Sequence, residues 1–403
     1  MTDRSGATSV DTVRAKHAVS VVFVLNGLAF ASWLSRVPAV RDGLDLTPGR
    51  LGLLLLCLSA GTAVALPLSG AVVARLGPAR TVAAMAAVVT LGLLVMAAGL
   101  SSAVVPLVGA GMFVYGIGTS GWDVAMNVEA ADVERLVGRT LMPRFHAGFS
   151  AGTVTGALLG AGCARLDIAL PAQLIGIALV VVLVAPLTTR WFTPVPTIDP
   201  DAEPRPGVLI AWREPRTLLI GLVVLAFALS EGVANDWVAL ALVDGYGAAE
   251  SVAATGFAIF VSAMTLGRLL GGGVVERIGR AATLRITGCL VAAGVAVVVW
   301  SPGLPGAMVG AGLWGIGASL GFPLGMSAAA DDEHRSAARV SVVASIGYTA
   351  FLGGPPLVGL LADSLGVRQA VVVAAVAGLG GALLARATAP VVAEQASAEH
   401  RLP

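Results

Sequence analysis

Residues 104–129 read VVPLVGAGMFVYGIGTSGWDVAMNVE, and the first charged residue in this stretch is Asp123. The uncharged part is long enough to cross the ~30 Å hydrocarbon core of a bilayer as a helix. A charged side chain at the middle of a membrane costs about 3 kcal/mol on insertion scales, so it faces the protein interior or a water-filled cavity. We therefore predict a membrane-spanning helix over 104–128 that carries a functional carboxylate.

The composition of the whole chain supports a membrane protein. Of its 403 residues, 57% are apolar and 12% are charged, whereas a soluble domain is about 25% charged. Alternating strand patterns are absent, and backbone groups in lipid must bond internally, so an all-α protein is predicted. The net charge of +1 indicates no nucleic-acid partner. The three scattered cysteines predict neither a metal site nor a disulfide framework, and no cofactor is expected.

Uncharged runs recur along the chain and predict twelve spans. They cover 18–40, 51–73, 81–100, 104–128, 144–163, 168–188, 216–242, 252–274, 282–300, 304–328, 338–361 and 368–386. Residues 189–216 (TRWFTPVPTIDPDAEPRPGVLIAWREPR) form the longest polar, proline-rich stretch and read as a linker. The predicted organisation is a six-helix bundle over 1–188, a linker over 189–215 and a second six-helix bundle over 216–403. Gly353-Gly354-Pro355-Pro356 is expected to interrupt the eleventh span.

The placement of arginine predicts the orientation in the membrane. With the N-terminus inside, the outer segments carry Arg36, Arg41, Arg50, Arg165 and Arg368, Arg268 lies within a span, and all other basic residues fall inside. Cytoplasmic segments are enriched in Lys and Arg. Both termini are therefore predicted to be cytoplasmic, in a bacterial plasma membrane.

The two halves resemble each other. GAGMFVYGIGTSGWDVAMN (109–127) parallels GAGLWGIGASLGFPLGMS (310–327), and GAVVARLGPAR (70–80) parallels GGVVERIGRAA (272–282). Parallel repeats with a binding site near the midplane between them are typical of secondary transporters.

The repeated loops carry a family resemblance. Gly272-x-x-x-Glu276-Arg277-x-Gly279-Arg280 and its counterpart around Arg75 resemble the Gly-x-x-x-Asp-Arg-x-Gly-Arg loop of the major facilitator superfamily. This resemblance implies the twelve-helix fold and a latch between the halves on the cytoplasmic side, formed by Arg75, Glu276, Arg277 and Arg280. The first loop has Ala74 and Pro78 at motif positions, so a weaker latch is expected there.

Asp123-Val-Ala-Met-Asn127, followed by Phe145-His146-Ala-Gly-Phe149, is similar to the fucose-permease-like branch of that superfamily. In this branch the acid on helix 4 is implied in proton coupling and sugar binding, and His146 stands where the branch has an asparagine. The branch's acid on helix 1 has no counterpart in residues 29–38. That difference leaves fucose as the substrate and the branch's proton relay open.

Asp123 is the strongest candidate for a cavity carboxylate. Asp123 and Asn127 share one helical face because they are one turn apart, whereas Glu129 is turned away. The alternative is a structural ion pair between Asp123 and Arg144. His146 suits a proton relay because its unperturbed pKa is about 6.5, although a packing role is the alternative.

The seventh span carries LSEGVANDW (229–237). A helical rise of 1.5 Å per residue from Arg216 places Glu231 in the outer half of the membrane. Asn235 shares its face, and Asp236 is predicted to lie near the outer surface. Glu231 is a second candidate for proton coupling, and Asn235 for solute binding.

The first span offers Asn26 and Trp33 as solute-binding candidates and Arg36 as an outer gate. In the superfamily, helices 1 and 7 are implied to meet across the pseudo-two-fold axis. We expect Arg36 to pair with Asp236 or Glu231 when the outside closes, and snorkelling of Arg36 to the interface is the alternative. Trp33 and Trp237 are expected either to anchor at the membrane interface or to stack on a ring-shaped solute.

The predicted function is secondary active transport of a small polar solute, such as a sugar or related metabolite. Symport with protons by a monomer is expected, and the alternative is efflux of a metabolite or drug by proton antiport. The sequence lacks a clustered nucleophile, a metal-ligand set and a nucleotide-binding loop. An enzyme and ATP-driven transport are therefore not predicted.

Overall fold

The computed structural model describes residues 9–138, 141–193, 208–331 and 335–390, and every regular element in these ranges is helical. The first half contains α1 (Ser9–Leu34), α2 (Val37–Gly43), α3 (Pro48–Leu76), α4 (Pro78–Ser101), α5 (Val105–Val137), α6 (Met142–Arg165) and α7 (Leu170–Thr189). The second half contains α8 (Val208–Ala211), α9 (Pro215–Tyr246), α10 (Glu250–Ile278), α11 (Arg280–Trp300), α12 (Leu304–Ala318), α13 (Gly321–Ala329), α14 (Ser336–Leu365), α15 (Val367–Ala370), α16 (Val372–Leu384) and the 3₁₀ helix η1 (Ala385–Thr388).

The all-α membrane fold is confirmed. Eleven helical segments of the described residues are long and apolar enough to cross a membrane. The remaining predicted span is α5, which is 33 residues long and carries the polar sequence around Asp123. The expected twelve-helix arrangement therefore agrees approximately with the structure.

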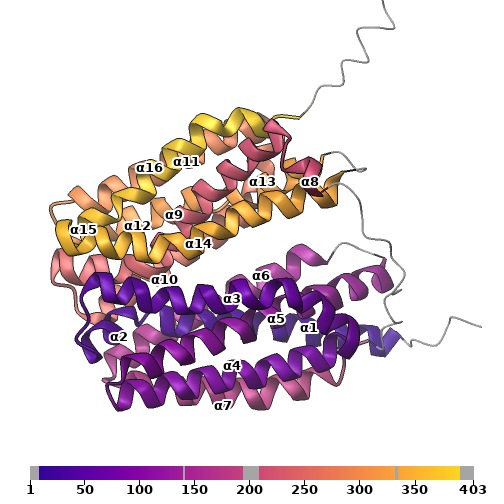
Figure 1. The fold of residues 1–403 in the computed structure, drawn as a ribbon, viewed down its shortest axis with the longest axis horizontal. Helices are drawn as coiled ribbons and strands as arrows, with labels where there is room; N and C mark the ends of the chain where they lie inside the picture. The colour runs from indigo at the N-terminus through magenta and orange to yellow at the C-terminus, as the bar shows by residue number, and fades with distance from the viewer. Residues whose placement is uncertain (1–8, 139–140, 194–207, 332–334, 391–403) are drawn as a thin grey trace, which may run out of the picture.

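The two halves form two bundles that lie side by side (Figure 1). The packing repeats between them: α1 packs on α6 as α9 packs on α14, and α3 packs on α5 as α10 packs on α12. The contacts across the boundary are related in the same way, because α3 meets α14 and α10 meets α6. The sequence repeat is thus a repeat of packing partners.

Several predicted helix boundaries were wrong. The first span breaks at Ser35 and Arg36 into α1 and the short α2. The predicted span over 304–328 matches one candidate membrane span, Leu304–Ala329, whose helix is interrupted between α12 and α13. By contrast, α14 continues through Pro355 and Pro356, so the predicted interruption is absent there. Neighbouring helices can stabilise proline within a membrane helix.

Glycine permits the turns and close contacts that this packing needs. Gly77 (φ 76°) ends α3 and Gly279 (φ 81°) ends α10, in the two loops that repeat in the sequence. This backbone region is essentially restricted to glycine. A Cβ on Gly27 would lie 2.2 Å from the carbonyl oxygen of Phe149, so α1 and α6 touch backbone to backbone.

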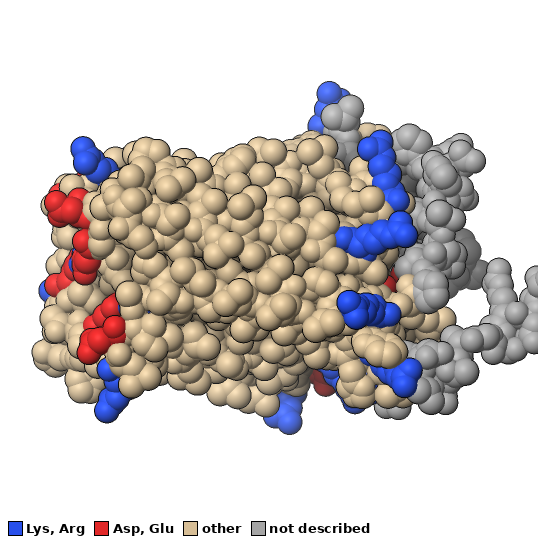
Figure 2. All heavy atoms as spheres, turned by 90° about the horizontal axis from the view of Figure 1, so that it is seen from below, with Lys and Arg blue, Asp and Glu red and all other residues tan. Residues whose placement is uncertain are grey.

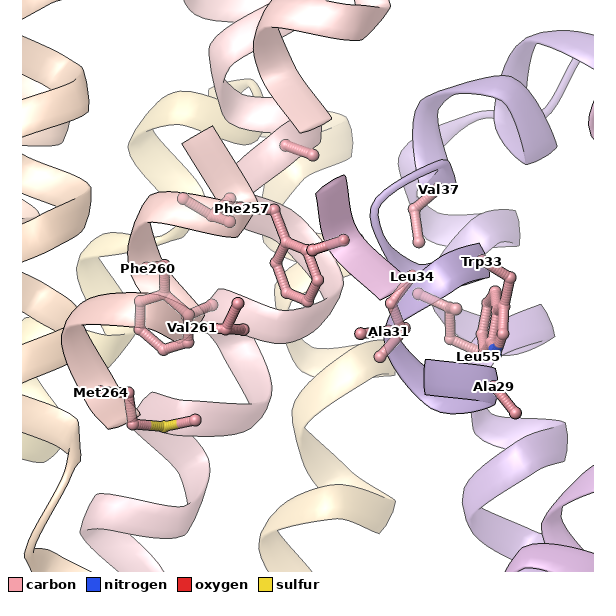
Figure 3. Packing of buried hydrophobic residues seen from close by; sticks show 14 of the residues in the cluster. Ala29, Ala31, Trp33, Leu34, Val37, Leu55, Phe257, Phe260, Val261 and Met264 are labelled. Carbon is pink, nitrogen blue, oxygen red and sulfur yellow. The ribbon is translucent and has the colours of Figure 1, made fainter. Parts of the chain in front are cut away.

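A continuous buried core links the halves, and charges collect at the two ends of the molecule. Leu34 of the first half and Phe257 of α10 belong to one apolar cluster (Figure 3). Figure 2 shows a broad uncharged belt, with Lys and Arg gathered at the end where α8 lies. We call this the linker end and the opposite end, where α2 lies, the α2 end (Figure 1). The belt fits a surface that faces lipid.

Candidate functional site

A cavity of about 320 Å³ lies between the halves, and we call it the central cavity. Its lining comes from α1, α3, α5 and α6 of the first half and from α9 and α14 of the second. Five of the predicted site residues line it: Asn26, Trp33, Asp123, Asn235 and Asp236. Helices far apart in the sequence therefore bring these polar groups together.

Asp123 faces the central cavity without a cation partner among the described residues. Asn127 donates its side-chain amide to the Asp123 carbonyl oxygen (2.8 Å) and to Asp123 Oδ1 (3.4 Å). The alternative ion pair with Arg144 is not formed. Asn127 is half-buried and does not line the cavity, so its position supports Asp123 from the next helical turn.

Asp236 is the second carboxylate of the central cavity. Its predicted place near the outer surface was wrong, because α9 continues beyond it to Tyr246 and the side chain turns toward Asp123's cavity. Within the described ranges, Asp236 makes no ion pair. Two carboxylates from opposite halves thus share one cavity without a neutralising cation from the described residues.

Trp33 is fully buried, at 0% exposed, and stands edge-to-face on Tyr115 with ring centroids 6.2 Å apart. Trp237 is also 0% exposed. Anchoring at the membrane interface was therefore the wrong alternative for both residues. Trp33 lines the central cavity and Trp237 does not, so stacking on a solute remains a prediction for Trp33.

A second cavity of about 630 Å³ lies nearer the linker end, and we call it the linker-side cavity. It shares Phe149, Tyr348 and Phe351 with the central cavity. Glu231 of α9 and Arg268 of α10 line it and form an ion pair, with Arg268 Nη2 3.2 Å from Glu231 Oε1. This places Glu231 on the linker side of Asp236 and gives it a partner within its own half.

His146 also lines the linker-side cavity, from the first half. Its ring packs edge-on against Phe23, with centroids 5.3 Å apart. His146 and the Glu231–Arg268 pair therefore face one space from opposite halves, whereas Asp123 lies in the adjoining cavity.

The α2 end is closed by polar contacts between the halves. Arg36 forms an ion pair with Glu250 across the halves. Within its own half, Arg36 also donates to Gln173 Oε1 of α7 at 2.9 Å. Arg41 Nη1 lies 2.6 Å from Asp244 Oδ1. The two ion pairs join the α1–α2 corner to the α9–α10 corner.

The prediction that Arg36 pairs with Asp236 or Glu231 was wrong. Arg36 sits at the break between α1 and α2, so its guanidinium reaches the α2 end, where α10 begins with Glu250. Asp236 and Glu231 lie deeper along α9. The snorkelling alternative was wrong too, because Arg36 is 4% exposed.

At the linker end, the residues of the predicted latch do not join the halves. Arg280 pairs with Asp331 at 2.8 Å, within the second half, and Asp331 also accepts from Arg216. Among the described residues, Arg75, Glu276 and Arg277 form no ion pair. The expected cross-half latch is therefore absent from this conformation.

The comparisons with known proteins agree with this architecture. The family model described as "Major Facilitator Superfamily" matches residues 19–332 and 221–402. The chain belongs to the major facilitator superfamily. It is a membrane transporter, not an enzyme.

Two sequence relatives match most of the chain. An uncharacterised transporter of Sinorhizobium fredii is 33% identical over 356 residues, which are 87% of this chain and 92% of the relative. The membrane protein MosC of Rhizobium meliloti is 26% identical over 360 residues, covering 88% of this chain and 85% of that protein.

Solved structures of two transporters share its fold. The nucleoside transporter NupG superposes with a TM-score of 0.72 at 14% identity, covering 96% of this chain and 100% of the other. The fucose:proton symporter FucP of E. coli superposes with a TM-score of 0.63 at 13% identity, covering 94% and 99%. At these identities the likeness concerns the fold, and membership of the fucose-permease-like branch stays a prediction.

The sequence analysis did not predict a role for three residues that make contacts around the site: Glu250, Arg268 and Asp363. Arg268 carried a signal, because a charged residue within a predicted span is a candidate for function. Asp363 accepts the backbone N–H of Gly49 at 2.9 Å across the halves. Glu250 and Asp363 lie at predicted span ends, where acidic residues are ordinary, and only the folded arrangement reveals their partners.

Proposed function

We propose that this protein is a proton-coupled secondary transporter of a small polar solute that works by alternating access. The observation that carries the proposal is the central cavity, which lies between the halves, holds Asp123 and Asp236, and is closed from the α2 end by Arg36 and Glu250. Secondary transporters bind their solute at such a boundary and rock the two repeats around it.

The orientation follows from the charges at the two ends. The gathering of Lys and Arg at the linker end (Figure 2) supports a cytoplasmic location for that end and for both termini, in a bacterial plasma membrane. With this orientation, the closed α2 end is the outer side. The structure then corresponds to an inward-facing state of a monomer.

The carboxylates provide the means of coupling. A carboxylate can hold a proton in one environment and release it in another when its solvation and charged neighbours change. Asp123 has no cation partner among the described residues, whereas Glu231 is paired with Arg268. We assign Asp123 the main coupling role, and Glu231 with His146 a role in passing protons along the linker-side cavity.

The size of the cavity supports a small solute. A volume of about 320 Å³ lies at the lower end of the usual range for ligand pockets, roughly 300–1,000 Å³. The structural relatives NupG and FucP are named for nucleosides and fucose. Solutes of that size are therefore the first to screen.

The proposal is tested in two steps with the purified full-length protein. Thermal-shift screening against sugars, nucleosides, organic acids and amines first finds a bound solute. Uptake of that solute into proteoliposomes is then measured with and without an imposed pH gradient. The gradient should drive accumulation by the parent and by Asp167→Asn, a control at an exposed carboxylate, but not by Asp123→Asn. Equal accumulation by Asp123→Asn would overturn its coupling role, and transport indifferent to pH would overturn proton coupling.

A further inference from the structure

The charged side chains that line the central cavity are all acidic among the described residues. Asp123 and Asp236 line it from opposite halves, and the described lining residues include no Lys, Arg or His. Arg268 of the linker-side cavity pairs with Glu231, and Arg36 at the α2 end pairs with Glu250, so each of these arginines already has a carboxylate partner. In a site of low dielectric, such uncompensated carboxylates attract a cation far more strongly than they would in water.

Two polar side chains in the same wall, Ser120 and Asn26, have a weak partner or none among the described residues. Ser120 is 4% exposed, lines the cavity, and its hydroxyl makes no hydrogen bond among the described residues. Asn26 is 2% exposed, and within the described part of the chain its side-chain amide donates to the sulfur of Met126 alone, at 3.7 Å. Buried polar groups of native proteins are normally satisfied by protein, water or ligand. These two groups are therefore placed to bond with polar atoms of an occupant.

The rest of the wall is rich in aromatic rings. Those that line the central cavity are Phe30, Trp33, Tyr115, Phe149, Tyr348 and Phe351. Aromatic faces attract ammonium groups, with about 0.5–2 kcal/mol for each well-placed contact. Carboxylates together with aromatic rings therefore favour a positively charged nitrogen over a neutral or anionic group.

We propose that the solute of this transporter is an organic ammonium: a small molecule that bears a protonated amine, held between Asp123 and Asp236, and hydroxyl groups that bond to Ser120 and Asn26. The protonated amine supplies the positive charge that the described lining residues do not provide, and the aromatic rings enclose the carbon skeleton. An anionic solute would meet two carboxylates without a compensating cation. This inference rests on the proposed transport function and names its substrate class.

The test compares two series of probes that share a ring within each series and differ in the charge of one substituent. Tryptophan fluorescence and thermal shift of the purified protein are measured against glucosamine, N-acetylglucosamine, glucose and glucuronate, and against cyclohexylamine and cyclohexanol. We expect at least one amine to bind saturably and at least tenfold more tightly than its neutral partner. Asp236→Asn and Asp123→Asn should each reduce that preference about tenfold, while Asp167→Asn preserves it. Equal binding by the neutral probes, tighter binding by glucuronate, or no saturable binding by either amine would overturn the inference.

A second readout separates this inference from the proposed function. Electrical currents are recorded from proteoliposomes on a solid support as each probe is added. If the substrate class alone is wrong, a neutral or anionic solute produces transport currents that Asp123→Asn abolishes. If the transport function is wrong, no solute of any charge produces a current that depends on the protein.

Discussion

Arg36, at the break between α1 and α2, and Glu250, the first residue of α10, form an ion pair that joins the two halves of the protein. Arg36 is buried, and its guanidinium also bonds to Gln173 and to the carbonyl oxygen of Ile168. A buried cation with several partners is costly to leave unpaired. The pair is therefore a specific lock on the closed α2 end, and it must break if that end opens.

Breaking this lock should favour opening of the α2 end. Arg36→Ala and Glu250→Ala should each raise the rate at which a membrane-impermeant reagent, applied from the α2 side of proteoliposomes, labels a cysteine introduced at Ser59. Ser59 lines the central cavity, and the native cysteines are replaced in this background. Because the residues act on one contact, the two effects should be non-additive, with a coupling energy of about 0.5–3 kcal/mol. Additive effects in the double variant would contradict the lock.

The helices that meet at the boundary should also resist added volume. A Cβ on Gly52 would lie 2.4 Å from the carbonyl oxygen of Pro355 on α14, across the halves. Gly52→Ala should therefore separate α3 from α14 and increase labelling of the same cysteine. Gly353→Ala is the matched control, because a Cβ there meets nothing within 4 Å. Equal labelling in both variants would show that the α3–α14 contact does not hold the α2 end closed.

The carboxylate of Asp236, which has no ion-pair partner among the described residues, should cost stability in the protein without solute. Removing a desolvated charge without a partner stabilises a folded protein, so Asp236→Asn should raise the unfolding temperature, with a gain of about 1 kcal/mol or more. Asp331→Asn is the contrasting variant, because it loses ion pairs to Arg216 and Arg280 and should lower stability by up to about 1 kcal/mol. Thermal unfolding in detergent measures both, and a destabilised Asp236→Asn would mean that Asp236 has a favourable partner.

A carboxylate at the linker end predicts a dependence of stability on pH. Hydrogen bonds from Arg339, with those from Thr217 and Arg335, lower the pKa of Glu214 to about 2. A carboxylate whose folded pKa is depressed adds stability above its unfolded pKa, about 4.3, and that stability is lost as pH falls toward the folded pKa. The unfolding temperature of the parent should exceed that of Glu214→Gln at pH 7, and the difference should shrink between about pH 5 and pH 3. A constant difference over that range would reject this role of Glu214.

Much of the fold was predictable because the bilayer imposes simple rules. Uncharged runs located the spans, and the repeated loops around Gly77 and Gly279 located equivalent turns in both halves. The break at Ser35 was missed because both sides of it are apolar enough to continue a span. Hydropathy also gave no reason for α14 to continue through Pro355, since continuation depends on the helices packed around it.

The candidate site was predictable at the level of residues rather than partners. An acid within an uncharged span marks a cavity, and this located Asp123 and Glu231. Pairing depends on how far along each helix a residue lies and on which way it faces. The partner predicted for Arg36 was wrong for that reason. Glu250 begins a helix, whereas Asp236 lies deep in the central cavity. The spacing of charges in the sequence does not show how far along the membrane either acid lies.

Alternating access itself is tested most directly by measuring both ends of one protein. Spin labels at Ser102 and Pro302 would report on the α2 end, and labels at Leu76 and Ile278, both more than 40% exposed, would report on the linker end. In Glu250→Gln, pulsed electron resonance should show longer distances at the α2 end together with shorter distances at the linker end. Opening of the α2 end with an unchanged linker end, or no change at either end, would contradict the account.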